Sequence, residues 1–545
     1  MIPKSIENEI RSQLSDLIAS EKIVVPAIVL EVPRNKDHGE ISCNVALIAA
    51  KQLRQPPRKI AEKLAVSFQT SPETVEKVEV AGPGFLNFFL SRQFFNTVLK
   101  NLLDDPSHYG DSDEGNGEKM HFEFVSANPT GPLNIVSARS ASVGNTLVNV
   151  FRKRGFSVHS EYYVNDGGGQ IRKLGMSLKA RIKQVENGKD SAEIPEGGYH
   201  GEYLINIAKN FTASEQEMTD SDETLGRIAA DSIRDGQEET LNDFQVTFDN
   251  WFRESSLYEK DLVNQAYEKL ISSNVTYQKD GAVFFKASEF GDSEDRVVKT
   301  SDGRYTYVIP DLAYHLLKST GYNRAVNLLG PDHHGHILQL KSALKALGLP
   351  DEFFHPIIIQ QVNLKRDGAE VKMSKRAGVG ITLDELTDEV GVDAARYFFL
   401  LRRTSSSLDF DIDLAKKHSE DNPVFYVQYA HARIQSILRQ PAALEFDLNT
   451  GIDISVLKEE AELDILRLIN RYPMTLSAVV RGIEPHPLTI YLTELAKAFH
   501  TFYAKHRVIG EDHKLTAARL LLCKGVAGML REVLNLMGVS APNKM

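Results

Sequence analysis

Apolar positions follow different rhythms along the chain, and the changes of rhythm divide it into regions. In residues 1–110, strand-like runs at 23–31 and 77–90 flank a helical pattern, which predicts a small α/β domain. From 118 to 385, short apolar runs alternate with helical spacing, as is typical of a mainly parallel sheet covered by helices. Beyond this region the strand signal fades, and long helical stripes predict an all-helical C-terminal bundle.

Smaller features refine these boundaries. The stretch 109–119 is rich in Gly, Asp and Ser and marks the end of the first domain. An acidic, mostly helical piece at about 166–265 interrupts the alternation and is interpreted as an insertion. Residues 386–415 form a predicted connecting stem, and 416–545 form the predicted bundle.

Individual elements can also be predicted. In the central region, the expected strands are 121–126, 157–164, 281–287, 304–309, 325–330 and 356–364, and the expected helices include 138–153 and 312–318. In the C-terminal region, the expected helices are 384–402, 420–438, 456–481, 488–505 and 514–536.

Composition narrows the class of protein. The 545 residues are 42% hydrophobic and 25% charged, which is ordinary for a soluble globular chain. Two cysteines, Cys43 and Cys523, are too few for a disulfide framework or a thiolate zinc site, so we expect a reducing compartment, the cytoplasm. No run of eighteen apolar residues predicts a membrane span. The net charge of −11 argues against bulk polyanion binding, yet residues 501–545 hold seven Lys/Arg against three Asp/Glu.

Two motifs suggest phosphate chemistry. Residues 121–155 read as a strand, a Pro/Gly turn and a helix, and a helix N-terminus favours an anion. An ordinary structural turn has the same pattern. Residues 365–380 read KRDGAEVKMSKRAGVG, a basic loop between glycines that suits a reaction in which pyrophosphate leaves. A solvated charged loop is the alternative, although KMSK is more specific than a generic basic cluster.

The string KMSKR resembles the second signature of class I aminoacyl-tRNA synthetases. The arginyl-tRNA synthetases in particular are similar in segments spread over almost the whole chain: DHGEISCNVAL at 37–47, SANPTGPL at 126–133, EYYVNDGGGQ at 161–170, GYHGEYL at 198–204, TSDGRYTYVIPDLAYH at 300–315, GPDHHGHI at 330–337, DNPVFYVQYAHARI at 421–434 and LMGVSAPNKM at the end. The resemblance implies a Rossmann-like α/β core with a parallel sheet, an N-terminal domain that contacts the tRNA elbow and a helical anticodon-binding domain. It also implies a monomer that joins L-arginine to tRNA-Arg, using ATP with Mg²⁺.

The family's first signature, HxGH, is altered here to Asn134, Ile135, Val136 and Ser137. Asn134 and Ser137 can still donate hydrogen bonds, but neither carries the positive charge of a protonated histidine. One interpretation is a working site with substituted donors, and the other is a catalytically weak paralogue that binds tRNA or arginine without charging. Activity is favoured because KMSKR and the amino-acid pocket remain. The residues implied as catalytic are Lys372, Lys375, Asn134 and Ser137, and those implied as ATP-binding are Pro132, Asn134, Val136, Ser137, Asp332, His333, Lys372, Met373, Ser374 and Lys375.

An arginine pocket follows from the same resemblance. A guanidinium is a planar fork of five donors that carboxylates match in bidentate fashion. Asp311 is the expected partner of the guanidinium, with Tyr307 four residues earlier on the same helical face. Taken singly, Glu123 could be a strand-end surface residue and Asp311 a helix cap. The implied arginine-binding residues are Glu123, Ser126, Asn128, Tyr307 and Asp311.

The cluster Asp332, His333, His334 and His336 lacks the spacing of a zinc motif, so we expect no structural metal. The resemblance implies that this strand end borders the adenylate. In the bundle, aromatic, polar and basic side chains suit the stacking and edge contacts that read unpaired bases. A bundle core would use the same tyrosines. The implied tRNA-binding residues are Tyr426, Gln428, Tyr429 and Arg433.

Overall fold

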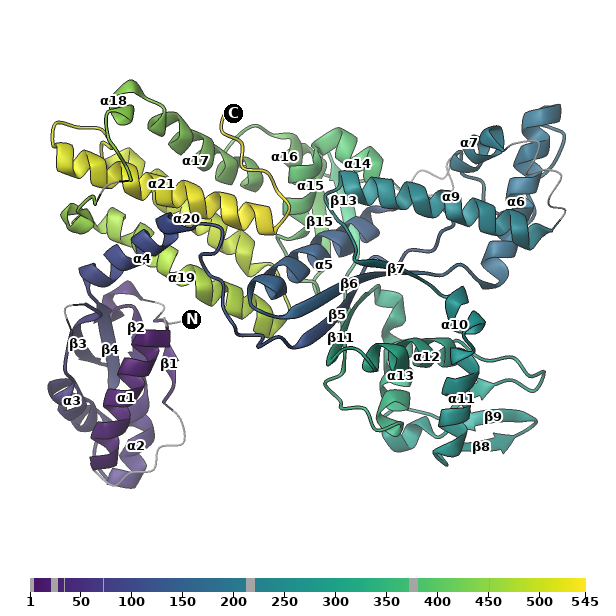
Figure 1. Cartoon of the computed structure of the whole chain (residues 1–545), viewed down its shortest axis with the longest axis horizontal. Helices are drawn as coiled ribbons and strands as arrows, with labels where there is room; N and C mark the ends of the chain where they lie inside the picture. The colour runs from purple at the N-terminus through teal and green to yellow at the C-terminus, as the bar shows by residue number, and fades with distance from the viewer. Residues whose placement is uncertain are drawn as a thin grey trace.

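The computed structural model describes residues 4–20, 28–33, 35–71, 73–211, 221–371, 381–449 and 451–545. At one end lies a small domain whose antiparallel sheet has the strand order β1-β2-β4-β3 (Figure 1). The predicted strand 77–90 is a hairpin, because the glycines of Gly82-Pro83-Gly84 adopt positive φ angles and reverse the chain. The domain comprises α1 (Lys4–Ser20), β1 (Leu30–Glu31), η1 (Lys36–His38), β2 (Ile41–Cys43), α2 (Val45–Leu53), α3 (Pro57–Ser67), β3 (Val75–Ala81), β4 (Phe85–Leu90) and the linking helix α4 (Arg92–Asp104).

The centre of the molecule is a five-stranded sheet of order β12-β11-β5-β6-β7, in which every neighbouring pair is parallel. The predicted α/β core is therefore confirmed. The strands β6 and β7, which follow β5 in the chain, lie on one side of it, and the later strands β11 and β12 lie on the other side. The strand order therefore reverses between β5 and β11, and parallel sheets bind ligands at the carboxyl ends of the strands at such a point. The elements are β5 (Lys119–Glu123), α5 (Ile135–Lys153), β6 (Ser157–Val164), β7 (Asn250–Arg253), β11 (Arg324–Leu329) and β12 (Phe354–Ile358).

Helices project from one end of this sheet, between β6 and β7 (Figure 1). They are α6 (Gly168–Asn187), α7 (Tyr203–Asn210) and α9 (Asp222–Asp243), as the helical insertion predicts. The strand β7 was not predicted, and it lies within the range expected for the insertion. It pairs with β6 through Glu161–Asn250 to Val164–Arg253, so the chain has already rejoined the core sheet at residue 250.

A second lobe has its own hydrophobic core, to which α11, α12 and α13 contribute. It contains α10 (Ser255–Glu259), α11 (Leu262–Ser272), β8 (Thr276–Lys279), β9 (Ala282–Phe285), η2 (Ala287–Phe290), β10 (Arg296–Lys299), α12 (Val308–Ser319), η3 (Pro331–His333) and α13 (His334–Ala346). The predicted strand 304–309 is wrong. Tyr305 forms only an isolated bridge with Lys299, and α12 already begins at Val308, with Pro310 in its first turn. A short apolar run does not distinguish a strand from the start of a helix.

The predicted strand 356–364 is two strands in different sheets. The second is β13 (Val362–Arg366), which joins β14 (Ala369–Glu370) and β15 (Leu408–Asp411) in a small separate sheet. The predicted helix 384–402 is likewise two helices, because Gly391 at φ +81° ends the first.

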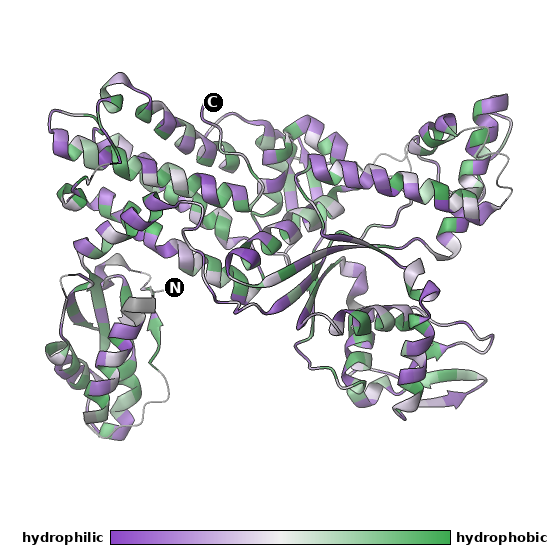
Figure 2. Ribbon diagram, in the orientation of Figure 1, coloured by the Kyte–Doolittle hydropathy of each residue, from purple (hydrophilic) through white to green (hydrophobic). Residues whose placement is uncertain are grey.

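The helical bundle is confirmed, and its helices turn apolar faces toward one another (Figure 2). In the described residues no helix has the length and apolarity needed to cross a membrane. The helices of this region are α14 (Leu383–Val390), α15 (Val392–Phe399), α16 (Ile412–Lys416), α17 (Pro423–Leu438), α18 (Pro441–Leu444), η4 (Ile454–Val456), α19 (Glu460–Gly482), α20 (Pro487–Lys505) and α21 (His513–Leu536).

One buried guanidinium joins the core to the bundle. Arg396 of α15 donates to the carbonyl of Phe244 at 2.7 Å, to that of Met537 at 2.8 Å and to Asn145 Oδ1 at 2.8 Å. These partners follow α9, follow α21 and lie on α5. A Cβ at position 538 would meet the guanidinium at about 2.4 Å, so Gly538 leaves room for it.

Candidate active site

The N-terminus of α5 carries its own cap. Asn134 Oδ1 accepts hydrogen bonds from the amides of Val136 and Ser137, both at 3.0 Å, as an N-cap asparagine does. Two first-turn donors that an anion would use are therefore already satisfied. Asn134 is exposed and the side chains of Val136, Ser137 and Pro132 are half-buried, so the site remains open to a ligand.

The turn between β5 and α5 is strained and firmly held. Val125 and Ser126 have φ angles of 68° and 42°, a region that non-glycine residues rarely adopt. The amide of Val125 donates to Ser140 Oγ at 3.0 Å, and Tyr162 Oη donates to the carbonyl of Ala127 at 2.9 Å. Buried Gln237 of the inserted α9 donates to the carbonyl of Gly131 at 2.8 Å. The insertion thus helps to hold the turn that carries the candidate site.

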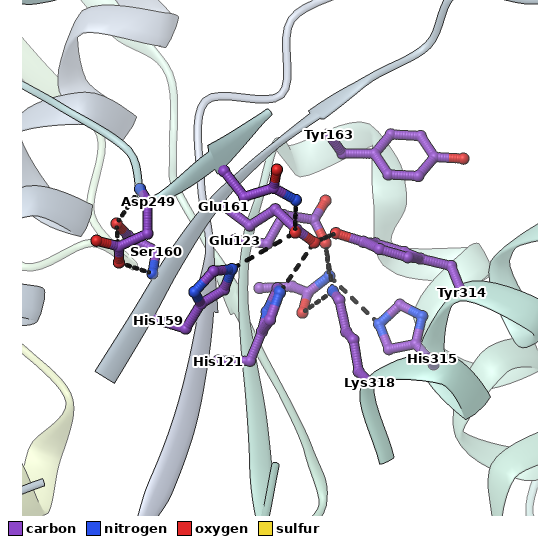
Figure 3. A network of polar contacts seen from close by, with 12 residues as sticks. His121, Glu123, His159, Ser160, Glu161, Tyr163, Asp249, Tyr314, His315 and Lys318 are labelled. Atoms are coloured by element: carbon purple, nitrogen blue, oxygen red, sulfur yellow. Dashed lines mark hydrogen bonds and ion pairs between the residues drawn. The ribbon is translucent and has the colours of Figure 1, made fainter. Parts of the chain in front are cut away.

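Glu123 lies at the carboxyl end of β5 in a buried polar network (Figure 3). Its Oε2 accepts from Lys318 Nζ and from Asn327 Nδ2, both at 2.6 Å, while Ser126 Oγ donates to Oε1 at 3.3 Å. Lys318 is itself buried and lies 3.9 Å from the centre of the Tyr314 ring. The carboxylate is therefore held in place, and a lysine from α12 compensates its charge.

A second layer lies behind Glu123 on the same sheet face. Glu161 accepts from Tyr314 Oη at 2.5 Å, from His121 Nε2 at 3.0 Å and from Asn250 Nδ2. Although burial acts to raise it, the hydrogen bonds from His121 and its neighbours hold the pKa of Glu161 below the usual range. Burial lowers the pKa of His121 to about 4, with the Lys318 charge acting in the same direction. This layer is thus an ionised carboxylate beside a neutral imidazole.

Asp311 and Glu254, here called the acidic wall, lie near Tyr163 together with Glu123: burial raises the pKa of Tyr163, and the charges of these three carboxylates raise it further. Asp311 of α12 is paired with His336 Nε2 of α13, and this hydrogen bond raises the pKa of His336. Glu254, directly after β7, is hydrogen-bonded to Tyr163, and burial together with the charges of Asp311 and Asp166 raises the pKa of Glu254. A group whose pKa rises because of neighbouring carboxylates gains from a nearby cation. The wall therefore suits a positively charged ligand.

The remaining arginine-binding candidates Asn128 and Tyr307, and the ATP-binding candidates Asp332 and His333, are exposed. Asn128 is exposed, and its Nδ2 donates to Gln170 Oε1 at 2.9 Å. Tyr307 is 89% exposed at the start of α12, one turn before Asp311, so in this structure its ring does not form a closed wall. Asp332 and His333 lie exposed in η3, immediately beyond the carboxyl end of β11.

Residues 372–380 of the basic motif fall outside the described residues, and with them Lys372, Met373, Ser374 and Lys375. The chain that follows it is described. Thr382 forms an isolated bridge with Asn134, and the amide of Leu383 donates to the carbonyl of Leu133 at 2.8 Å. Thr382 and Glu385 form the predicted capping box at the start of α14. This part of the chain thus starts beside the N-terminus of α5.

The tRNA-binding candidates divide into two groups on α17. Tyr426 and Tyr429 are half-buried against His500 of α20, and exposed Arg433 lies 5.0 Å from the Tyr503 ring. Together they form an aromatic and basic strip. Gln428 is instead buried and donates to Asp393 Oδ2 at 2.7 Å and to the carbonyl of Ser540 at 2.9 Å. Its amide nitrogen is used inside the protein, and an RNA-binding role for Gln428 stays a prediction.

Comparison with known proteins matches three successive parts of the chain. The model described as "tRNA synthetases class I (R), catalytic domain" covers residues 98–400, more than half of the chain. The chain belongs to the arginyl-tRNA synthetase family. The models described as "Arginyl tRNA synthetase N terminal domain" and "DALR anticodon binding domain" cover residues 4–90 and 427–545.

Relatives of this family match over almost their full length. The arginine–tRNA ligase of Oceanobacillus iheyensis is 43% identical over 551 residues, which cover 99% of this chain and 99% of that protein. That of Desulfosudis oleivorans is 42% identical and covers 95% of each. A crystal structure titled as a putative arginyl-tRNA synthetase from Campylobacter jejuni is 33% identical, with a TM-score of 0.77, over 84% of this chain and 100% of its own. The Thermus thermophilus arginyl-tRNA synthetase shares the fold, with a TM-score of 0.78 at 19% identity over 100% of both chains.

Sequence reasoning within the family missed two groups at the site, Lys318 and Glu254. Lys318 is separated by 195 residues from the carboxylate it contacts, so no local pattern reveals the pair. Glu254 follows a strand of four residues, NWFR, in which no side chain is fully buried, so the strand has no clear apolar pattern. Recognition of that strand would have placed Glu254 at a carboxyl edge, where ligands bind.

Proposed function

We propose that the chain joins L-arginine to tRNA-Arg in two steps. The arginine carboxylate attacks the α-phosphorus of ATP and pyrophosphate leaves, which gives arginyl-adenylate. A hydroxyl of the terminal tRNA ribose then attacks the arginyl carbonyl, and AMP leaves. The protein's contribution is to orient the reactants and to stabilise developing charge, because no covalent bond to the enzyme is required.

The observation that carries this proposal is the acidic wall at the carboxyl edge of the sheet. Asp311 and Glu254 come from separate elements, yet the Asp311 charge acts together with burial to raise the pKa of Glu254. A guanidinium satisfies such a pair with several parallel donors. In the proposed complex it replaces His336 at Asp311. Glu123, held by Lys318, and Asn128 lie toward the substrate's ammonium and carboxylate.

The same wall explains the choice between amino acids. A lysine ammonium is a compact point charge and leaves acceptors of the pocket unpaired, at a cost of about 1–3 kcal/mol for each buried group. Citrulline, which has the shape of arginine without the charge, loses the attraction of both carboxylates. Arginine is therefore preferred on shape and on charge.

ATP, with Mg²⁺ bound to its phosphates, is placed at the N-terminus of α5. Asn134, Val136, Ser137 and Pro132 line this end, and Asp332 and His333 lie beyond β11 on the same edge of the sheet. The anchoring of Thr382 beside Asn134 supports a role for Lys372, Met373, Ser374 and Lys375 at the phosphates, since only five residues separate Arg376 from Thr382. Lysines there neutralise the charge on the leaving pyrophosphate.

The tRNA is placed along the bundle. Tyr426, Tyr429 and Arg433 offer stacking faces and a cation to unpaired bases. The N-terminal domain contacts the tRNA elbow in this proposal. We further propose that the protein acts as a cytoplasmic monomer, a setting in which the two buried, unpaired cysteines stay reduced.

The decisive experiment measures charging of tRNA-Arg with labelled arginine, ATP and Mg²⁺. Wild type is compared with Lys375→Ala and with the matched control Lys345→Ala, which removes an exposed lysine that pairs with Asp351. We expect charging by wild type and by the control, and a loss of about 100-fold or more in Lys375→Ala. Lysine and citrulline are expected to give no charged product.

A synthetase-like binder without chemistry predicts a different result. Its motivation is the replacement of both HxGH histidines, although the 43% identical relative is named a ligase. If wild type retains tRNA on a filter yet charges none of it, the proposed activity is wrong. If Lys375→Ala charges as fast as wild type, the activity stands and the role given to the basic motif is wrong.

A further inference from the structure

Three side chains behind Glu123 bring metal-binding atoms together. They are His121 on β5 and His159 and Glu161 on β6, and their ligand atoms all lie within 4.8 Å of one another. His121 Nε2 is 3.0 Å from Glu161 Oε1, and His159 Nε2 is 3.6 Å from Glu161 Oε2. Ligand atoms in a tetrahedral zinc site are about 3.3 Å apart, given zinc–ligand bonds of about 2.0–2.1 Å. The two measured separations lie on either side of this value.

We propose that His121, His159 and Glu161 bind a divalent transition metal ion, and that Zn²⁺ is the ion the ligand set suits. Two imidazole nitrogens and one carboxylate oxygen are ligands that zinc accepts, with a fourth position left for water. Magnesium and calcium prefer oxygen ligands throughout, so a site with two nitrogens discriminates against them. The site is separate from the proposed chemistry, and no step of charging passes through it.

The strand register explains why these residues converge. In the parallel pair β5–β6, His121 lies opposite His159 and Glu123 lies opposite Glu161. Alternate residues of a strand point to the same face, so all four side chains share one side of the sheet. Both imidazoles turn toward the Glu161 carboxylate in Figure 3. The three ligands are thus held by the backbone of two central strands and not by loops, which favours a preformed site.

Neighbouring groups orient the ligands. Tyr314 Oη donates to Glu161 Oε1, and Asn250 Nδ2 donates to Glu161 Oε2, so the carboxylate is fixed. Oε1 also accepts from His121 Nε2, and its second lone pair becomes available when that nitrogen loses its proton and binds the ion. The Tyr322 ring stacks on His159 at 5.6 Å and meets His121 edge-on at 5.0 Å. Such second-layer contacts are what hold metal ligands in position.

The surroundings also provide access. The His159 side chain is 29% exposed, whereas that of His121 is 1% exposed. An ion can therefore enter from the His159 side and become enclosed at His121. Because the cluster lies two residues before Glu123 on β5 and before Tyr163 on β6, the bound ion would cross-link the strands that carry the arginine pocket. The spacing of the sequence predicts no structural metal, since the ligands meet only through strand pairing.

The test is metal binding to the full-length chain after removal of metal with a chelator. Co²⁺ serves as the probe because tetrahedral Co²⁺ absorbs visible light, and Zn²⁺ is then added as competitor. We expect about one Co²⁺ per chain, displaced by Zn²⁺ but not by excess Mg²⁺. His159→Ala is expected to weaken binding by at least about tenfold. The matched control His355→Ala removes an exposed histidine from β12 of the same sheet and is expected to bind Co²⁺ like wild type.

Two results would overturn the proposal. One is the absence of stoichiometric Co²⁺ or Zn²⁺ binding by wild type, which would make the cluster a hydrogen-bonded network only. The other is binding by His159→Ala as tight as that of wild type. Circular dichroism checks that the variant is folded. If His159→Ala is unfolded, Glu161→Gln keeps the size of the side chain while removing the ligand charge, and it must show the same weakening. Charging activity is measured separately, so failure of the metal site and failure of the proposed function are distinguishable.

Discussion

The self-capped N-terminus of α5 makes Asn134→Asp the most informative substitution. The carboxylate retains an acceptor for the amides of Val136 and Ser137, which lie 3.0 Å from Asn134 Oδ1 in the wild type. A negative charge at a helix N-terminus also stabilises the helix, by about 0.3–1 kcal/mol. We therefore expect the variant to melt at the same temperature as wild type or slightly above it.

The effect on ATP has the opposite sign. A phosphate oxygen that reaches the first turn of α5 lies about 5 Å from the new carboxylate, if both are within hydrogen-bond range of neighbouring amides. At an effective dielectric constant of about 20, two unit charges at that separation repel by about 3 kcal/mol. This predicts a fall of roughly 200-fold in kcat/KM for ATP.

The assay combines ATP-dependent charging with thermal melting. Asn134→Ala serves as the companion variant, since it removes the cap, at about 1 kcal/mol of stability, without adding charge. Gln440→Asp is the control, because it places the same charge at the distant N-terminus of α18. If Asn134→Asp keeps kcat/KM for ATP within about threefold of wild type, the phosphates do not approach α5 and the proposed placement of ATP is wrong.

Three further predictions concern arginine and tRNA. Asp311→Asn removes the proposed guanidinium partner and is expected to raise the KM for arginine about 10- to 100-fold, which corresponds to the loss of a charged hydrogen bond. The control Asp302→Asn, in the exposed turn before α12, is expected to leave this KM unchanged. If Asp311→Asn also leaves it unchanged, Asp311 does not belong to the arginine pocket. Because its pKa is raised, His336 is fully protonated and paired with Asp311 below about pH 6.5, and the ion pair is lost as the pH rises through the raised pKa. Loss of the pair frees Asp311 for the substrate, so the KM for arginine is expected to fall over that pH range. A His336→Gln variant with the same pH profile as wild type would contradict this. Tyr429→Ala is expected to raise the KM for tRNA about 5- to 150-fold at unchanged melting temperature, because stacking on one base contributes about 1–3 kcal/mol. The control Tyr277→Ala, at an exposed tyrosine of the β8–β9 hairpin, is expected to leave the KM unchanged. A KM for Tyr429→Ala equal to that of wild type would exclude stacking at Tyr429.

The parts of the fold that sequence predicted are those with a sustained local pattern. The helices of the bundle have apolar stripes over many turns, and four of the five expected ones are single helices close to the predicted bounds. The exceptions depend on single residues or on pairing. Gly391 divides one helix, Pro310 belongs to a helix start where a strand was expected, and β7 exists as a strand because β6 lies beside it. Distant partners decide such short elements, and a local pattern does not contain them.

The candidate site divides in the same way. Glu123, Asp311 and Asn134 stand in motifs that resemble the family. In the structure Glu123 ends β5, Asp311 lies in the first turn of α12 and Asn134 caps α5. Their immediate partners, Lys318, His336 and Glu254, come from elements far apart in sequence. The environment of each carboxylate could therefore not be predicted. Lys318 compensates the charge of Glu123, His336 pairs with Asp311, and burial and neighbouring carboxylates raise the pKa of Glu254.

The buried guanidinium of Arg396 has a mechanical consequence. Its acceptors lie on α5, directly after α9 and directly after α21. Any rotation of the bundle against the core would therefore have to break charged hydrogen bonds in a place that water does not reach. A hinge is therefore not expected at this junction. A force applied at the far end of the bundle would therefore act on α5 through a rigid connection. It would reach the N-terminus of that helix, the end capped by Asn134, without being absorbed by a flexible linker.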